Sequence, residues 1–188
     1  MARARGFLGP GPVEEHIAHA LAFARAWGAP PPAQALDLGS GGGLPGLVLA
    51  DLWPGTAWVL LDASERRTTF LAEVAPPSVT VRRARAEEAG REPALRGAFE
   101  LVTARSFGPP PVTAECAAPF LRPGGRLVVS EPPDGADRWP AEGAALVGLV
   151  PLRRTVTAVG SFQVLVQERP IDDRFPRRVG LPAKRPLF

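Results

Sequence analysis

The chain has 188 residues, of which 45% are hydrophobic and 22% are charged, and its formal net charge is +3. This composition is typical of one globular domain, and the single cysteine, Cys116, excludes a disulfide framework and a cysteine metal cluster. No apolar run reaches the ~20 residues of a membrane span, and the first residues lack the apolar core of a signal peptide. We therefore expect one cytoplasmic domain over residues 1–188, a monomer that contacts no membrane, with Cys116 buried in a helix.

The first predicted element is a helix over residues 13–27, where apolar residues recur at helical spacing. It forms most of an N-terminal helical segment, residues 1–33, and it ends at Gly28 before a run of prolines. An apolar strand ending in Asp37 follows. That strand leads into a glycine-rich turn, from which a helix starts near Pro45, a residue suited to a first helical turn.

Strand and helix signals then alternate along the chain. In chain order they predict a strand over 57–62, a helix over 64–74, strands over 78–82 and 99–104, a helix over about 111–121 and a strand over 126–130. Two last strands, 149–159 and 161–168, are joined at Gly160-Ser161, a turn so short that it can connect only antiparallel strands. The pattern predicts an α/β fold whose seven-stranded, mostly parallel sheet has a C-terminal antiparallel hairpin and helices on both faces. This Rossmann-like architecture matches class I methyltransferases better than dehydrogenases.

The glycine-rich turn carries the strongest functional signal. A strand, a tight glycine turn and a helix N-terminus together form a nucleotide-type binding site. The dinucleotide fingerprint G-x-G-x-x-G lacks its third glycine, because Leu44 follows Gly39 and Gly41 at that spacing. Asp37 would repel a diphosphate, but it would attract the ammonium group of S-adenosylmethionine, which carries no phosphate. The sequence therefore favours S-adenosylmethionine over a dinucleotide, and a turn that binds nothing is the remaining alternative.

A second carboxylate, Asp62, ends the predicted strand 57–62. Nucleotide-binding βαβ folds place an acid at this position, where it accepts hydrogen bonds from the ribose hydroxyls. The alternative is that Asp62 opens the next helix, because Ser64 and Glu65 follow it. The two roles are compatible, and we favour ribose binding.

Six segments of the chain carry a more specific pattern. They are Asp37-Leu-Gly-Ser-Gly-Gly-Gly-Leu-Pro-Gly46, Leu61-Asp62 with Arg66-Arg67 and Phe70-Leu71, Arg85-Ala86-Glu87, Val102-Thr103-Ala104-Arg105, Leu121-Arg-Pro-Gly-Gly125 and Phe175-Pro-Arg-Arg-Val-Gly-Leu-Pro-Ala-Lys-Arg-Pro-Leu187. Together they resemble the glucose-inhibited division protein B family, the RsmG-type methyltransferases of small-subunit ribosomal RNA. The first and fifth segments by themselves would indicate only a class I methyltransferase.

The resemblance implies S-adenosylmethionine as methyl donor and N7 of one guanine in 16S ribosomal RNA as acceptor. It implies that Gly39, Gly41 and Leu44 lie at the methionine side, where Asp37 would meet the ammonium, with Asp62 at the ribose, Ala86 and Glu87 beside the adenine, and Arg105 toward both cofactor and substrate. N7 has a lone pair and no proton, so its methylation needs no general base. Catalysis then rests on holding donor and acceptor in line, with Arg105 as the candidate positioning residue.

The basic C-terminal tail, residues 170–188, is rich in proline and therefore disfavours a helix. Apolar residues along it predict that it is anchored to the body of the domain. Arg177, Arg178, Lys184 and Arg185 would then contact RNA phosphates, which gives affinity without base specificity. The alternative is a solvated basic tail.

Some features argue against parts of this interpretation. Only about one helix precedes the glycine-rich turn, where the family has a longer region, and Glu131 stands where the family commonly has a lysine. A carboxylate at the substrate mouth would be unfavourable to RNA phosphate. A class I methyltransferase with another RNA or small-molecule acceptor, or an inactive paralogue that binds RNA or the ribosome, therefore stays open. His16 and His19 have a spacing that could grip a metal, but no acidic or cysteine cluster accompanies them, so we expect none.

Overall fold

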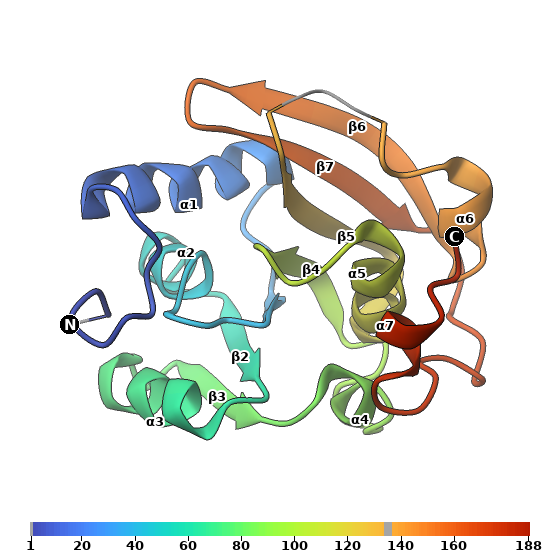
Figure 1. Cartoon of the computed structure of the whole chain (residues 1–188), viewed down its shortest axis with the longest axis horizontal. Coiled ribbons are helices and arrows are strands. Elements are labelled where there is room, and N and C mark those ends of the chain that lie inside the picture. The colour runs from blue at the N-terminus through green and yellow to red at the C-terminus, as the bar shows by residue number, and fades with distance from the viewer. Residues whose placement is uncertain (1, 134–136) are drawn as a thin grey trace.

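A seven-stranded sheet runs through the centre of the molecule (Figure 1). The structure is a computed structural model that describes residues 2–133 and 137–188. The strands are β1 (Gln34–Leu38), β2 (Ala57–Asp62), β3 (Val79–Arg83), β4 (Phe99–Ala104), β5 (Leu121–Glu131), β6 (Leu149–Thr157) and β7 (Gly160–Gln167). Their order is β3-β2-β1-β4-β5-β7-β6. Strands β1 to β5 pair in parallel and β7 is antiparallel to both β5 and β6, which confirms the predicted sheet.

Helices cover both faces of the sheet, as predicted. They are α1 (Val13–Trp27), α2 (Gly46–Leu52), α3 (Glu65–Val74), α4 (Ala86–Ala89), α5 (Pro110–Ala117), the 3-10 helix η1 (Ala118–Phe120), α6 (Ala141–Ala145) and α7 (Leu181–Lys184). Figure 1 shows α1, α2 and α3 on one side of the sheet and α4, α5, α6 and α7 on the other. Within the described ranges, no helix has the length and apolar character needed to cross a bilayer.

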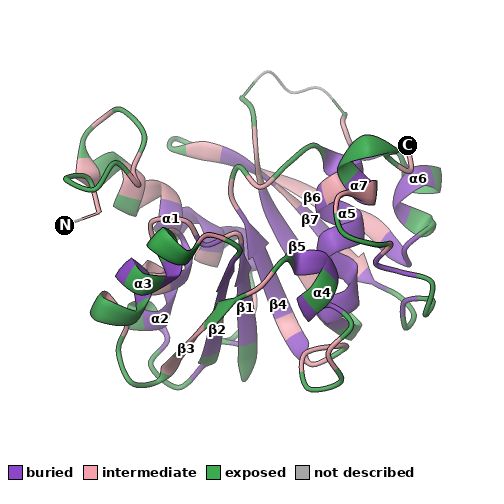
Figure 2. Ribbon diagram, turned by 60° about the horizontal axis from the view of Figure 1, so that its bottom comes forward, coloured by how far each residue is buried: buried purple, intermediate pink, exposed green. Residues whose placement is uncertain are grey.

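The alternation of side chains along the strands divides the core into two layers. In β1, Ala35 packs with residues of α1 and α2, whereas Leu36 and Leu38 pack with residues of α4 and α5. Strands β1, β2, β4 and β7 are buried through most of their length, whereas the edge strands β3 and β6 are not (Figure 2). Because Asp37 lies on the same face of β1 as Ala35, its side chain points toward α2 and not off the end of the strand.

Several predicted boundaries are wrong for identifiable reasons. The helix predicted over about 111–121 is α5 followed by η1, because Pro119 has no N–H to continue the α-helical ladder. Gly160-Ser161 is not the hairpin turn but the start of β7. Thr157 pairs with Gly160, and its hydroxyl donates to the Gly160 carbonyl at 3.0 Å, so the turn is Ala158-Val159.

The tail also differs from its prediction, because α7 forms one helical turn in it. Gly180 precedes this turn with φ of +77°, and Pro182 occupies its start. A proline in the first turn of a helix leaves no hydrogen bond unmade, so the prolines of the tail do not prevent this turn.

We predict that Gly46→Ala lowers the free energy of unfolding by about 1–3 kcal/mol, the usual cost of overpacking. A Cβ at Gly46 would lie 2.8 Å from Asp37 Oδ2 and would also press on the Leu60 side chain. Urea denaturation measures the effect. The matched control is Gly55→Ala in the turn between α2 and β2, where a Cβ has no neighbour within 4 Å. Equal losses of stability in the two variants would contradict the prediction.

Candidate functional site

The glycine-rich loop, residues 39–45, lies at the carboxyl edge of the parallel strands, where the strand order reverses between β1 and β4. Gly39 and Gly41 have φ of +69° and +56°, values that residues with side chains disfavour. The N–H groups of Gly39 and Ser40 donate to the carbonyl of Leu61 at 2.8 and 3.0 Å. The loop is therefore fixed to the end of β2.

A cavity of about 320 Å³, here called the α5 cavity, opens beside this loop. It is lined by Leu38, Gly39, Leu61, Asp62, Ala63, Ala84, Arg85, Ala86, Glu87, Phe107, Gly108, Pro109, Val112, Cys116, Ala183 and Pro186. Four of the predicted cofactor residues, Gly39, Asp62, Ala86 and Glu87, thus meet in one cavity. Its apolar walls and carboxylates suit a flat base joined to a sugar, because the ring faces need apolar contact and the hydroxyls need an acceptor.

Asp62 joins the glycine-rich loop to the start of α3. Its Oδ2 accepts the N–H of Gly41 at 2.9 Å and its Oδ1 accepts the N–H of Ser64 at 2.8 Å. Arg67 Nη1 lies 3.5 Å from Oδ2, and Asp62 is only 5% exposed. Each carboxylate oxygen has two lone pairs, so Asp62 keeps capacity for the hydroxyls of a sugar while it holds the start of α3.

A second cavity of about 270 Å³, the α1 cavity, adjoins the loop on its other side. It is lined by Phe7, Leu8, Gly9, His16, Gly39, Ser40, Gly41, Leu44, Arg67, Arg105 and Ser106. The predicted methionine-side residues Gly41 and Leu44 meet Arg105 here. Gly39 lines both cavities, so a ligand lying across the glycine-rich loop would contact both sets of residues.

Arg105 follows β4 and is held by α1. Its Nη2 lies 3.0 Å from His16 Nδ1, and His16 Nε2 lies 3.2 Å from the Gly9 carbonyl. An imidazole protonated at Nε2 satisfies both contacts, because it donates to the carbonyl and accepts from the guanidinium. Burial lowers the pKa of Arg105, and the negative charge of Asp37 opposes that shift. The guanidinium is therefore fixed at the wall of the α1 cavity.

The histidines of α1 have roles in packing and hydrogen bonding. The His19 ring packs against Phe23 and Phe162, with ring centroids 5.7 and 5.2 Å apart. Burial, with the positive charge of Arg105, lowers the pKa of His19 to about 4. Across the part of the chain that the structure describes, no group of three or more His, Cys, Asp or Glu side chains could hold a metal ion. Cys116 is buried in α5, as predicted, and this burial raises the pKa of its thiol.

Asp37 is a buried carboxylate of β1. It is 1% exposed and lies outside the linings of the α5 and α1 cavities. Its Oδ1 accepts the Thr103 hydroxyl at 2.7 Å and its Oδ2 accepts the Gly46 N–H at 3.2 Å. Asp37 and Thr103 are paired across β1 and β4, so the carboxylate points beneath α2. Asp37 therefore braces the loop with both carboxylate oxygens engaged, and its contact with a ligand ammonium stays a prediction.

A third cavity of about 340 Å³, the β5 cavity, lies at the end of β5 and shares Phe107 with the α5 cavity. Its lining includes Ser106, Glu131 and Arg138. Glu131 accepts hydrogen bonds from Arg138 Nη1 and Trp139 Nε1, both at 3.0 Å, and its side chain is 6% exposed. Its charge is therefore paired with that of Arg138, which weakens the expected repulsion of RNA phosphate, and the effect on RNA stays a prediction.

The basic tail is anchored, and its cations are not equivalent. Arg178, Lys184 and Arg185 are exposed. Arg177 instead donates from Nε and Nη2 to the two oxygens of Glu115, at 2.8 and 2.6 Å, and Glu115 is fully buried. These hydrogen bonds raise the pKa of Arg177. The predicted RNA contact by Arg177 is therefore withdrawn, because its guanidinium is committed to the fold.

Comparison with known proteins agrees with this geometry. A family model described as GidB, rRNA small subunit methyltransferase G, matches residues 12–136. The ribosomal RNA small subunit methyltransferase G of Prochlorococcus marinus (strain MIT 9313) is 37% identical over 83% of this chain and 68% of its own length. That of Chloroflexus aggregans is 35% identical over 93% of this chain and 78% of its own length. The chain belongs to this family.

Solved structures support the same fold. A 16S rRNA N2 G1207 methyltransferase (RsmC) of T. thermophilus, in complex with AdoMet and guanosine, is 26% identical with a TM-score of 0.54. It matches 77% of this chain, and the chain spans 37% of its length. The antibiotic-resistance methyltransferase Kmr is 15% identical with a TM-score of 0.58, over 77% of this chain and 91% of Kmr. The sheet is therefore that of a class I, Rossmann-like methyltransferase, as predicted.

Sequence reasoning missed several contributors to the cleft of this methyltransferase. Phe107 borders two cavities, and a Cβ at Gly39 would lie 2.7 Å from its ring. His16 holds Arg105, and Ala183 with Pro186 brings the tail to the α5 cavity. Only Phe107 had a local signal, as an aromatic residue two positions after Arg105. The others are distant in sequence from the predicted site residues that they meet: His16 and Arg105 are 89 positions apart, and Ala183 and Pro186 are more than 90 positions from Ala86 and Glu87.

Asp37 generates a prediction about pH. Burial, opposed by the Thr103 and Gly46 hydrogen bonds, raises the pKa of Asp37 from 3.8 to about 6. The folded protein therefore binds this proton more tightly than the unfolded chain. The stability it contributes is fully present below pH 4 and is lost as the pH rises through 6, a loss of order 3 kcal/mol by pH 7.

We predict that Asp37→Asn removes this loss, because an amide can accept from Gly46 and donate to Thr103 without ionising. The measurement is urea unfolding of both proteins from pH 4 to pH 7. The difference between the two profiles cancels the other titrating groups, and it should grow in favour of the variant with rising pH. Parallel profiles would show that Asp37 titrates normally.

Proposed function

We propose that this protein transfers a methyl group from S-adenosylmethionine to N7 of a guanine in 16S ribosomal RNA. The observation that carries the proposal is the pair of cavities that share Gly39 at the carboxyl edge of the sheet. One offers apolar walls and carboxylates, and the other offers a fixed guanidinium. These are the two chemistries that an adenosine and an amino acid require.

On the adenosine side, Asp62 would accept hydrogen bonds from the ribose hydroxyls. It is already oriented by the N–H groups of Gly41 and Ser64, so little ordering is needed on binding. Ala86 and Glu87 line the same cavity beyond Asp62, where the adenine would lie. The apolar side chains around them supply contact to the ring faces.

On the methionine side, Arg105 would meet the carboxylate of the amino acid. Arg67 lines the same cavity, which makes the region cationic, and Gly39, Gly41 and Leu44 give close access to the loop. Arg105 is held by His16, so it acts as a positioning residue with a fixed direction. We assign no contact with the ammonium group to Asp37, because its two carboxylate oxygens bond to Thr103 and Gly46.

The acceptor would enter through the β5 cavity, which meets the α5 cavity at Phe107. An aromatic side chain at this junction can stack on an unpaired base. The lone pair of N7 forms the new bond to the methyl carbon, and the electrons of the broken carbon–sulfur bond stay on sulfur. No proton is moved, so the residues of the cleft need only align the two reactants.

Exposed cations of the tail, Arg178, Lys184 and Arg185, would contact RNA phosphates. Ribosomal RNA as substrate implies a cytoplasmic enzyme, and we propose that it works as a monomer without bound metal. Size-exclusion chromatography with light scattering and metal analysis of the purified protein check these two points.

The test of the proposed function is methylation of 16S ribosomal RNA or small-subunit particles with methyl-labelled S-adenosylmethionine. Chain cleavage specific for N7-methylguanine locates the product. We expect Asp62→Asn to weaken cofactor binding by about 10–100-fold in calorimetry, because hydrogen bonds to a charged acceptor contribute roughly 1.5–3 kcal/mol. The thermal melting curve of the variant controls for folding. No cofactor binding by the native protein, or transfer only to another base or a small molecule, would contradict the proposal.

A separate prediction concerns the tail. Replacing Arg178, Lys184 and Arg185 by alanine should weaken RNA binding and reduce the slope of log affinity against log salt by roughly 0.7 for each phosphate that is no longer neutralised. Cofactor affinity should stay unchanged. The matched control is Arg122→Ala, an exposed arginine at the start of β5 on the opposite edge of the sheet. An unchanged salt slope in the triple variant would rule out phosphate binding by the tail.

A further inference from the structure

We infer that the C-terminal segment, residues 171–188, is a wall of the cofactor pocket that binds the adenosine end of the ligand. Ala183 and Pro186 of this segment line the α5 cavity together with Asp62, Ala86 and Glu87. The inference rests on the proposed function, because it assigns that cavity to S-adenosylmethionine. It gives the tail a role in cofactor binding that its basic character does not suggest.

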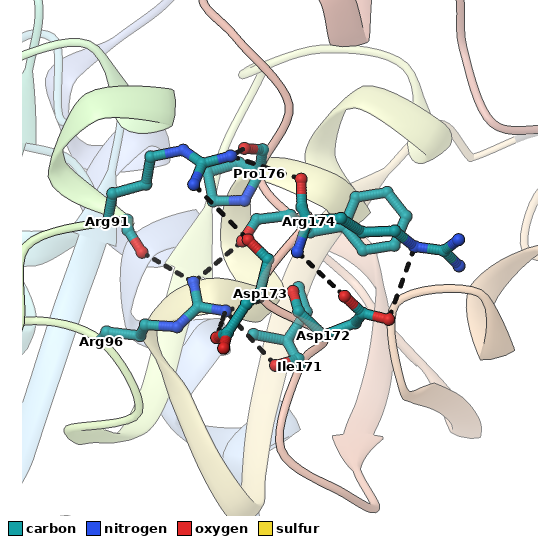
Figure 3. A network of polar contacts seen from close by, with 9 residues as sticks. Arg91, Arg96, Ile171, Asp172, Asp173, Arg174 and Pro176 are labelled. Atoms are coloured by element: carbon teal, nitrogen blue, oxygen red, sulfur yellow. Dashed lines mark hydrogen bonds and ion pairs between the residues drawn. The ribbon is translucent and has the colours of Figure 1, made fainter.

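Two arginines that follow α4 hold the first half of the segment (Figure 3). Arg96 donates to the carbonyls of Ile171 and Phe175 at 3.3 and 2.9 Å, and Arg91 donates to those of Arg174 and Pro176. Each guanidinium bridges several carbonyls of an irregular stretch that has no strand partner. The backbone is therefore fixed by side chains in place of a ladder.

The middle of the segment is held by a buried ion pair. Glu115 of α5 is fully buried, and it receives the Arg177 backbone N–H at 2.8 Å in addition to the bidentate guanidinium. Arg177 Nη2 also donates to the Arg185 carbonyl at 2.7 Å, which ties both sides of α7 together. Leaving Glu115 buried without this partner would be costly, so the docked state is strongly preferred.

A direct contact joins the segment to the proposed adenine site. Glu87 is 5% exposed, and its Oε1 accepts the Gly180 N–H at 2.9 Å. Glu87 lines the α5 cavity, so the residue predicted to lie beside the adenine is oriented by the residue that caps α7. Docking of α7 and the shape of the adenine site are therefore coupled through one carboxylate.

The surface that α7 presents to the cavity fits this role. Ala183 and Pro186 are small and apolar, and they are exposed in the structure although their segment is anchored. The faces of an adenine ring are apolar. Contact between the ring and exposed apolar side chains at a cavity wall removes both surfaces from water, which favours binding. The exposed cations Lys184 and Arg185 lie between them in sequence, so residues 183–186 would serve the cofactor and the RNA with different side chains.

The first experiment measures proximity. In Ala183→Cys, a maleimide should modify the introduced thiol, because Ala183 is exposed whereas Cys116 is 2% exposed and its thiol pKa is raised by burial. Saturating S-adenosylmethionine, or methylthioadenosine, which lacks the amino-acid part, should slow this modification about tenfold or more. The control is Val179→Cys, an exposed position of the same segment outside the cavity lining, whose modification rate should not change. Equal modification rates at position 183 with and without these ligands would overturn the inference.

The second experiment measures affinity by calorimetry. Ala183→Phe should weaken binding of S-adenosylmethionine and of methylthioadenosine by the same factor, about tenfold or more, equivalent to ~1.4 kcal/mol. Val179→Phe should leave both affinities within about twofold, and both variants should melt as the native protein does. A penalty for S-adenosylmethionine that methylthioadenosine does not share would also overturn the inference.

Asp62→Asn in the same titrations separates the two proposals. If Asp62→Asn loses affinity while Ala183→Phe and the thiol protection show no effect, the cofactor site stands and the tail inference fails. If the native protein binds neither ligand, the proposed function fails and the inference fails with it.

Discussion

The site depends on one buried carboxylate that joins three elements. Asp37 accepts hydrogen bonds from Thr103 of β4 and from Gly46 at the start of α2, and it is almost inaccessible to solvent. These contacts fix the angle at which α2 leaves the sheet and hence the course of the glycine-rich loop. Gly46 is required because any side chain there would collide with the carboxylate. The edge of the sheet is therefore held by contacts within the protein that need no ligand.

The same device recurs around the cleft. Asp62 joins β2 to the glycine-rich loop and to α3, Glu87 joins α4 to α7, and Glu115 joins α5 to the tail. In each case a buried carboxylate accepts backbone N–H groups from a segment that has no strand partner. Such groups would otherwise be unsatisfied, so the carboxylates order the irregular parts of the chain on which binding depends. Two of them, Asp62 and Glu87, also face the α5 cavity.

The order of the cavities along the sheet edge follows the proposed reaction. The α5 and α1 cavities meet at Gly39, and the α5 and β5 cavities meet at Phe107. The segment Arg105–Phe107, which follows β4 directly, contributes to all three cavities, so donor and acceptor would meet beside it. Because the acceptor nitrogen needs no base, a cleft that supplies direction and charge is sufficient for the transfer.

The sequence by itself determined the seven strands, the mostly parallel sheet and the presence of a C-terminal hairpin, because apolar runs that alternate with helical patterns and turn residues are local signals. It also located Gly39, Gly41, Leu44, Asp62 and Arg105 at strand ends, since strand ends share one edge of a parallel sheet. Only the tertiary structure decided where each charge points. Asp37 lies on the face of β1 that packs against α2, so its carboxylate points beneath that helix. Glu115 and Glu131 point inward, and they pair with Arg177 and Arg138. The contact between the tail and the α5 cavity could not be predicted from the sequence either. It results from interactions between residues more than 60 positions apart, which no local pattern encodes.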